Sequence, residues 1–526
     1  MKNRYFLINR LKLTLLAPVV CLSLMMTSCE KDVTELEPYD RLTESSAFST
    51  PERIELAIAG VYDAAQSGFF AGGAVRGYPF GAAHIEQGDN RGEDVVNLEA
   101  FYAITYQSTY NAASANNLYH FETLYAVINK ANVVIEGVEK AVAGGLITEE
   151  IGKGYIAEAR FLRALSHHEL LVHYARPYNH TADASHLGVP YRTIAVNTPA
   201  RVEEASKQGR DTVKKGYELL LTDLDYAEEF LPETRAKKIS RVTKGAAIGL
   251  KTRVKLHMRD WAGVILEGNK LVPATGPFTS PIGGYRLEAS PATPFTNNSG
   301  NAESMFSFEN SATDNASVNG SLGQMYNANP GGRALVSISP IIWNASFWPV
   351  VDKRRDLTLK NSRAIFSNKY TDATTQTDWS PIMRYAEVLL NVAEAESRAG
   401  NALRAMALLN AVRGRSTAEI YVGLTGDALT QAIVNERRIE FLSEGLRWKD
   451  IHRLAKEGKF GPAGIPAKVA PSSNMNPDYV AGSGTVRPGA LSIAAIPYDD
   501  FRFIWPIPIT EINANPVLAG QQNPGY

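Results

Sequence analysis

Three glutamates near the end of the chain have the spacing of residues that could act together. Glu436, Glu440 and Glu444 recur at four-residue steps, which places them on one face of a helix. Carboxylates grouped in this way could serve as a general acid and base or as metal ligands. However, arginines are as numerous as acids in this region, and no HExxH motif accompanies them. We therefore predict a structural ion-pair network that includes Arg384, Glu387, Arg413, Glu436, Arg437, Glu440 and Arg447.

A second set of chemically useful residues lies on segments rich in glycine and aromatic residues. The C–H face of a sugar ring packs on an aromatic ring, while polar side chains bind its hydroxyl groups. Each aromatic ring could instead belong to a small hydrophobic core beneath a loop. Our prediction for a glycan-binding site comprises Arg76, Tyr78, Asp89, Asn90, Tyr102, Tyr106, Tyr110, Asn111, Tyr326, Trp343 and Trp348.

Two groups of residues invite a metal interpretation. His167, His168 and His173 fall in one predicted helix, but neighbouring residues point to different faces, so only one of the adjacent pair could join His173. The stretch GDNRGEDVVNLE is rich in oxygen ligands but lacks the spacing of an EF-hand. We predict no metal site and no cofactor, and a structural calcium ion at this stretch remains the alternative.

Helices must position these residues. Apolar residues at three- and four-residue steps predict a helical frame over residues 50–66, 117–272 and 382–456. Within the last range, Ala399-Gly400-Asn401 separates two apolar stripes and predicts a hairpin with the length of a tetratricopeptide unit. Residues 67–116, 273–381 and 457–526 break the pattern and are predicted to be loop inserts with a few short strands, at MFSFEN and RAIFSNKY among others.

The N-terminus has the features of an exported protein. A basic start is followed by an apolar run from Leu13 to Met26 and then by Thr27, Ser28 and Cys29. This pattern is typical of a bacterial lipobox and predicts a signal peptide at residues 1–28, lipidation of Cys29 and a tether at residues 29–48. Cys21 is the other cysteine, so residues 30–526 contain no Cys nucleophile or disulfide. The net charge of −1 gives no basic footprint for nucleic acid.

A family resemblance rests on several blocks of sequence. RYAEVLLNVAEAESRAGN, LLNAVRGRS, VNERRIEFLSEGLRWKDIHRL and the ending WPIPITEINANPVLAGQQNPGY resemble the SusD-like (RagB/SusD) lipoproteins of Bacteroidota. The resemblance implies a mainly α fold in which tetratricopeptide-like helix pairs form a right-handed scaffold with long irregular loops. Residues 49–526 are then expected to form a single domain.

The resemblance also implies a function. It predicts an outer-membrane lipoprotein, at the cell surface, that captures a nutrient and delivers it to a SusC-like TonB-dependent transporter without covalent chemistry. An oligosaccharide is the expected ligand. The alternatives are a peptide-binding member of the family, a scaffold that binds only the transporter, and a lipid-anchored glycoside hydrolase that uses Glu436 and Glu440.

Overall fold

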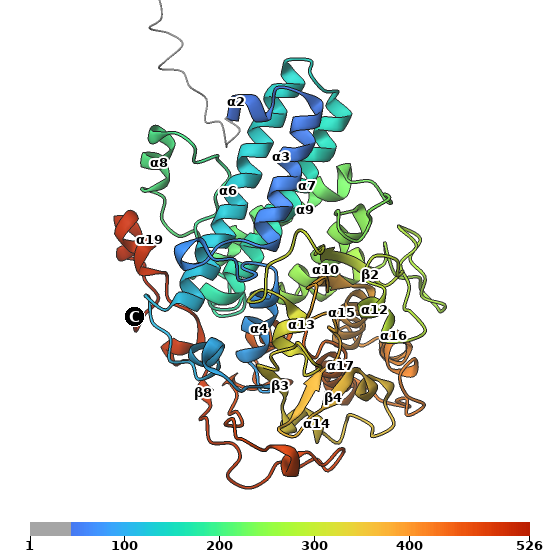
Figure 1. Cartoon of the computed structure of the whole chain (residues 1–526). Coiled ribbons are helices and arrows are strands. Elements are labelled where there is room, and N and C mark those ends of the chain that lie inside the picture. Colours follow the sequence, from blue (N-terminus) through green and yellow to red (C-terminus); the bar gives the residue numbers. More distant parts are fainter. Residues whose placement is uncertain (1–43) are drawn as a thin grey trace, which may run out of the picture.

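Helices dominate the computed structural model, which describes residues 44–526 (Figure 1). Cys29, the predicted signal peptide and most of the predicted tether lie outside the described residues. The frame consists of α3 (Pro51–Gln66), α6 (Ala115–Ala143), α7 (Glu149–Tyr174), α8 (Pro199–Ala205), α9 (Val213–Phe230), α10 (Lys244–Met258), α11 (Trp261–Gly268), α15 (Tyr385–Arg398), α16 (Ala402–Gly414), α17 (Gly426–Glu440) and α18 (Arg447–Leu454). These bounds fall within the three ranges predicted for the frame, except that α6 begins two residues earlier.

Threonine caps explain where several of these helices begin. The side chain of Thr50 accepts a hydrogen bond from the backbone N–H of Arg53 at the start of α3, and Pro51 occupies the first helical position. Thr148, Thr212 and Thr243 cap α7, α9 and α10 in the same way. Local sequence therefore fixes the helix starts before any tertiary contact forms.

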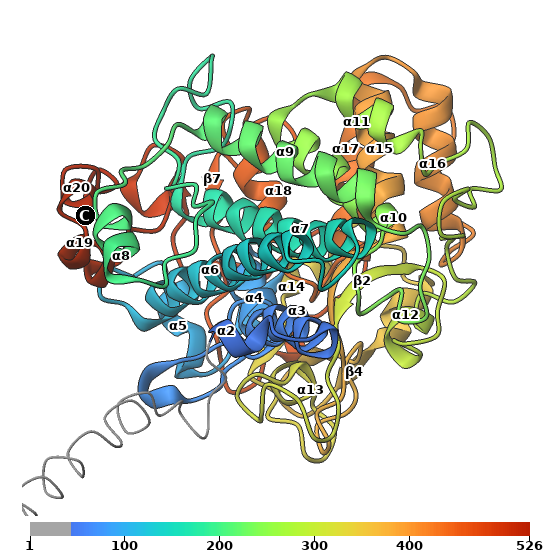
Figure 2. The same cartoon turned by 90° about the horizontal axis from the view of Figure 1, so that it is seen from above.

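The helices pack in a continuous series. Helix α3 lies against α6, α6 against α7, α7 against α9, α9 against α10, and α10 against α15, which also contacts α16 and α17. Figure 2 shows α6 and α7 side by side, with α15, α16 and α17 grouped at one end. One large apolar core runs through the series and includes residues from α3 to α17. This arrangement matches the predicted frame of tetratricopeptide-like helix pairs.

The inserts contain short strands and short helices. An antiparallel sheet has the order β1-β3-β5-β4, and two smaller pairs are β2 with β6 and β7 with β8. The strands are β1 (Val95–Asn97), β2 (Ser304–Phe308), β3 (Val336–Ile338), β4 (Thr358–Lys360), β5 (Ile365–Ser367), β6 (Ser380–Arg384), β7 (Gly464–Ile465) and β8 (Ile496–Pro497). The α-helices outside the frame are α2 (Glu44–Ala47), α4 (Ala82–Asn90), α5 (Ala103–Tyr106), α12 (Thr293–Thr296), α13 (Leu322–Tyr326), α14 (Pro340–Trp343), α19 (Ile509–Ala514) and α20 (Pro516–Ala519). Short 3-10 turns include η1 (Ala71–Gly73), η2 (Ala100–Tyr102) and η3 (Lys353–Leu357).

The prediction of an irregular loop over residues 67–116 was wrong at one place, because α4 is a helix. Every residue of α4 is buried, including Glu86, Gln87, Asp89 and Asn90. A helix that is buried on all sides shows no alternation between apolar and polar faces, so its sequence lacks the periodic signal. The two strands expected at MFSFEN and RAIFSNKY are present as β2 and β5.

Within residues 44–526, no helix combines the length and the apolar character that a membrane span requires.

Candidate functional site

Most of the aromatic residues predicted to bind a glycan are buried. The six side chains with at most 4% of their surface exposed are Tyr78, Tyr102, Tyr106, Tyr110, Tyr326 and Trp348. The hydroxyl of Tyr106 donates to the carbonyl oxygen of Val469 at 2.6 Å, and that of Tyr326 donates to Asp89 at 2.8 Å. In this conformation these rings offer no face to a ligand, so the prediction is corrected: Tyr110 belongs to the main core, and the other five form small cores beneath the inserts.

The tryptophans of the predicted site surround an arginine. The guanidinium carbon of Arg355 lies 4.5 Å from the Trp343 ring centroid and 4.2 Å from that of Trp348. The same guanidinium donates hydrogen bonds to the backbone carbonyls of Trp343, Trp348 and Pro349. Trp343 is partly exposed, but both rings serve to hold this segment together.

Of the other polar residues of the predicted site, Asp89 and Asn111 make hydrogen bonds, whereas the buried side chain of Asn90 has no hydrogen-bond partner among the described residues. Asp89 accepts hydrogen bonds from Tyr326 and from the backbone of Gly445, and burial raises the pKa of Asp89 to about 7 despite these bonds. Asn90 is buried, and exposed Asn111 accepts a hydrogen bond from the backbone of Ala113 in a local turn. These three side chains therefore do not converge on one surface.

The carboxylates considered as calcium ligands face cations instead. Asp94 pairs with Arg438 and lies 3.4 Å from Arg447, and Glu99 lies 2.7 Å from Arg363. A calcium ion would have to displace these guanidinium groups. Among the described residues, the one group of three or more potential metal-ligand side chains lies elsewhere, at His84, His120 and Glu169.

The glutamates of α17 are surrounded by arginines. Arg413 lies 2.8 Å from Glu436, and Arg384 lies 2.9 Å from Glu440. Burial opposes ionisation of Glu440, yet the charges of Arg415, Arg384 and Arg354 hold its pKa well below the ordinary value. This lowered pKa favours the ionised form of Glu440, which is unfavourable for the general acid of a glycoside hydrolase.

The other predicted members of the ion-pair network also have partners, some of them unexpected. Arg437 lies 2.9 Å from Asp450, Arg447 lies 2.5 Å from Glu93, and Glu387 lies 2.6 Å from Arg253. Sequence reasoning missed the partners that come from distant segments, namely Glu93, Arg253, Glu303, Arg354, Lys369, Arg415 and Asp450.

One member of the predicted glycan site, Arg76, lies in a partly exposed aromatic patch. Its guanidinium lies 4.1 Å from the ring centroid of Phe70 and 4.9 Å from that of Phe101. The Phe70 ring is 4.4 Å from Tyr119, and Phe69 is 39% exposed beside Tyr119. We call this set the aromatic patch and define it as Phe69, Phe70, Arg76, Phe101 and Tyr119, with Arg333 at 5.4 Å from Phe101 on its edge.

Two glycines and two buried tyrosines build the patch. Gly68 has a φ of +50°, and a Cβ there would come within 1.8 Å of the Tyr78 carbonyl oxygen, so the chain can fold back tightly after α3. Gly77, with a φ of +69°, allows a second reversal before α4. Tyr78 and Tyr102 then pack beneath Phe70, Phe101 and Tyr119. The sequence thus indicated the correct insert, but it could not distinguish the exposed rings from the rings that support them.

A cavity of about 850 Å³ near the C-terminus is a second place where a ligand could fit. It is lined in part by Arg176, His180, His186 and Arg210. Both guanidinium groups are already engaged, because Arg176 donates to the carbonyl of Asp500 and Arg210 to that of Gly188. The cavity therefore presents few free donors, and the aromatic patch remains the better candidate for sugar binding.

Comparisons with known proteins agree with this architecture. A sequence model described as the SusD family matches residues 290–526, and a second, described as starch-binding associating with outer membrane, matches residues 35–256. SusD-like protein P2 of Formosa agariphila is 26% identical over 420 residues, which cover 68% of this chain and 75% of that protein.

Solved structures show the same fold. A SusD superfamily protein from Bacteroides fragilis is 28% identical, with a TM-score of 0.73 over 89% of this chain and 99% of that one. Surface glycan-binding protein A from Bacteroides uniformis is 19% identical, with a TM-score of 0.67 over 90% of this chain and 99% of that one. At this lower identity the second likeness concerns the fold alone.

Proposed function

The chain belongs to the SusD family, and from this premise we propose that it binds an oligosaccharide at the aromatic patch and delivers it to an outer-membrane transporter. The observation that carries the proposal is the partly exposed group of rings around Arg76. The description of one matching family as starch-binding, and the name of the Bacteroides uniformis relative, support a glycan as the ligand. The proposed role includes no covalent step.

The chemistry of the patch suits a sugar. Aromatic rings offer large rigid faces to the C–H groups of a pyranose at little cost in conformational entropy. Arg76 and Arg333 lie beside the same rings and bring donors for hydroxyl groups. Because Tyr78 and Tyr102 support the rings from below, the patch is held in place before a ligand arrives.

Truncating the patch should weaken glycan binding. We expect the double variant Phe69→Ala/Phe101→Ala to lose about tenfold or more in affinity, which corresponds to at least about 1.4 kcal/mol. Calorimetry with a panel of starch- and laminarin-derived oligosaccharides measures the effect. Phe501→Ala is the comparison variant, because this ring is also 39% exposed but lines the C-terminal cavity, so a loss of affinity there instead would favour that cavity as the site. Equal affinity in the double variant and the wild type would place the site elsewhere.

We also propose that the protein is anchored to the outer membrane through lipid on Cys29, with its body at the cell surface. A lipid-modified cysteine with two or more acyl chains holds a protein firmly to a bilayer. We expect Cys29→Ala to move the protein from the membrane fraction to the supernatant of fractionated cells. Retention of the variant in the membrane fraction would contradict the anchor.

The proposed partner is a TonB-dependent, SusC-like transporter.

The alternative of hydrolysis by Glu436 and Glu440 is not favoured by the described residues, since both carboxylates are engaged by arginines. Glycans incubated with the protein should therefore be recovered intact.

A further inference from the structure

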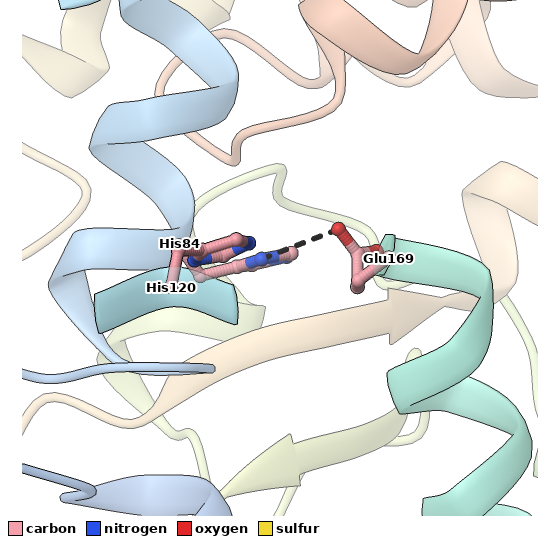
Figure 3. Close-up of side chains that lie close together, drawn as sticks. All are labelled: His84, His120 and Glu169. Atoms are coloured by element: carbon pink, nitrogen blue, oxygen red, sulfur yellow. Dashed lines mark ion pairs between the residues drawn. The ribbon is translucent and has the colours of Figure 1, made fainter. Parts of the chain in front are cut away.

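Three potential metal ligands from three helices meet in the buried interior. His84 of α4, His120 of α6 and Glu169 of α7 each have at most 4% of their surface exposed. One ligand atom from each lies within 4.8 Å of the others. Figure 3 shows the two imidazole rings side by side, with the Glu169 carboxylate facing them. From this convergence we propose that His84, His120 and Glu169 bind a divalent transition-metal ion, with zinc the best fit.

Several buried ring nitrogens of this cluster make no hydrogen bond to any described residue, which supports metal binding. Neither ring nitrogen of His120 has a hydrogen-bond partner within the part of the chain that the structure describes, and the same holds for Nδ1 of His84. Buried polar atoms are normally paired, because leaving one unpaired costs about 1 to 3 kcal/mol. A metal ion would use the lone pairs that protein groups leave free.

The distances suit a small ion. Nδ1 of His84 lies 3.6 Å from Oε2 of Glu169. Zinc–nitrogen and zinc–oxygen bonds of about 2.1 Å place neighbouring ligand atoms of a tetrahedral site about 3.4 Å apart. The His84–Glu169 distance is close to this value, whereas the three ligand atoms together span up to 4.8 Å and would have to draw in around the ion. Two imidazoles and one carboxylate favour zinc or a similar transition metal over calcium, which prefers oxygen ligands.

The surrounding charges leave one carboxylate oxygen for the metal. The ammonium of Lys449 lies 2.8 Å from Oε1 of Glu169, so Oε2 is the oxygen that faces the histidines. Arg253, the other nearby cation, is paired with Glu387 at 2.6 Å. Lys449 keeps Glu169 ionised in the absence of metal, although its charge also limits the affinity of the site.

His173 lies beside the cluster rather than in a ligand position. Arg91 donates a hydrogen bond to its Nδ1 at 3.1 Å, so the ring proton of the neutral imidazole is on Nε2. That Nε2 lies 3.8 Å from Oε2 of Glu169, which is beyond hydrogen-bond distance, so His173 is a neighbour of the carboxylate and not its hydrogen-bond donor.

A metal ion at this site would link two parts of the fold. Helix α4 belongs to the insert that carries the aromatic patch, whereas α6 and α7 belong to the frame. A metal ion would join the insert to the frame directly. Sequence reasoning missed the site because its ligands are widely separated along the chain.

Titration of chelator-treated protein with zinc alone tests the proposal. We expect one zinc ion per chain, measured by competition with a chromogenic chelator, and cobalt should give the visible absorption of a tetrahedral site. His120→Phe should lower zinc affinity by about 100-fold or more. Because the His120 nitrogens have no partner among residues 44–526, this apolar replacement should keep the metal-free protein folded, as thermal unfolding will show.

His168→Phe is the matched control. His168 lies on α7, is fully buried and also lacks partners for both ring nitrogens in the described structure, but it is outside the cluster. We expect this variant to bind zinc within about threefold of the wild type, because no ligand is lost. Failure of the wild type to bind either metal, equal binding by His120→Phe, or an equal loss in both variants would overturn the assignment.

Discussion

Replacing Glu440 by alanine is expected to lower the free energy of unfolding by about 3 to 5 kcal/mol. The Glu440 carboxylate is 3% exposed and pairs with Arg354 at 3.0 Å, with Arg384 at 2.9 Å and with Arg415. Removing this carboxylate leaves three buried guanidinium groups with one negative charge fewer to balance them. The cost arises from the lost compensation of these buried charges, each of which keeps another acidic partner, rather than from the loss of one hydrogen bond.

Urea denaturation followed by circular dichroism measures this effect. Glu203→Ala is the control, because Glu203 pairs with Lys207 at 2.7 Å while both side chains are about 70% exposed. An exposed pair of this kind contributes less than about 1 kcal/mol. Similar losses in the two variants would show that the Glu440 cluster is not buried as the structure describes.

The same cluster explains how the irregular inserts are fastened to the helical frame. Glu303, Arg354 and Lys369 come from the insert of residues 273–381, and Arg384 ends β6 just beyond it. These four residues pair with one another or with Glu436, Glu440 and Glu444 at the end of α17 and just after it. The insert of residues 67–116 is held similarly, because Glu93 and Asp94 pair with Arg438 and Arg447. Charges at the end of α17 and the start of α18 therefore join these two inserts to the frame.

The helical frame could be predicted from sequence because its signal is local. Stripes such as Val388, Leu389 and Val392 recur at the helical period, and threonine caps mark the helix starts. The presence of paired arginines around Glu436 and Glu440 could be predicted from composition. Their individual partners could not, since Arg354 and Glu303 are brought there only by tertiary packing.

The candidate site was only partly predictable for a related reason. An aromatic residue on a glycine-rich segment has the same sequence signature whether it is exposed, like Phe69, or buried, like Tyr106. Arg76 is partly exposed because a charged side chain is rarely removed from the surface altogether, and its role in binding stays a prediction. The ligands of the proposed metal site had no local signal.

A second large effect is expected at Gly88, where α4 touches the turn between α17 and α18. A Cβ at Gly88 would come within 2.2 Å of the carbonyl oxygen of Gly445, and the obstacle is backbone rather than a flexible side chain. The turn cannot retreat easily, because the N–H of Gly445 donates to Asp89 at 3.0 Å and Gly445 has a φ of +73°. We expect Gly88→Ala to lower the free energy of unfolding by about 3 kcal/mol.

The same substitution at Gly60 should have the opposite sign. Gly60 lies inside α3, and no described atom that could obstruct a Cβ lies within 4 Å of its position. Alanine is favoured over glycine in a helix by about 0.5 to 1 kcal/mol, so Gly60→Ala should stabilise the protein. Chemical denaturation of both variants decides the matter. Helix propensity alone would favour alanine at both positions. Stabilisation by Gly88→Ala would therefore mean that α4 and the α17–α18 turn are not in close contact. The insert that carries the aromatic patch would then be attached to the frame in another way.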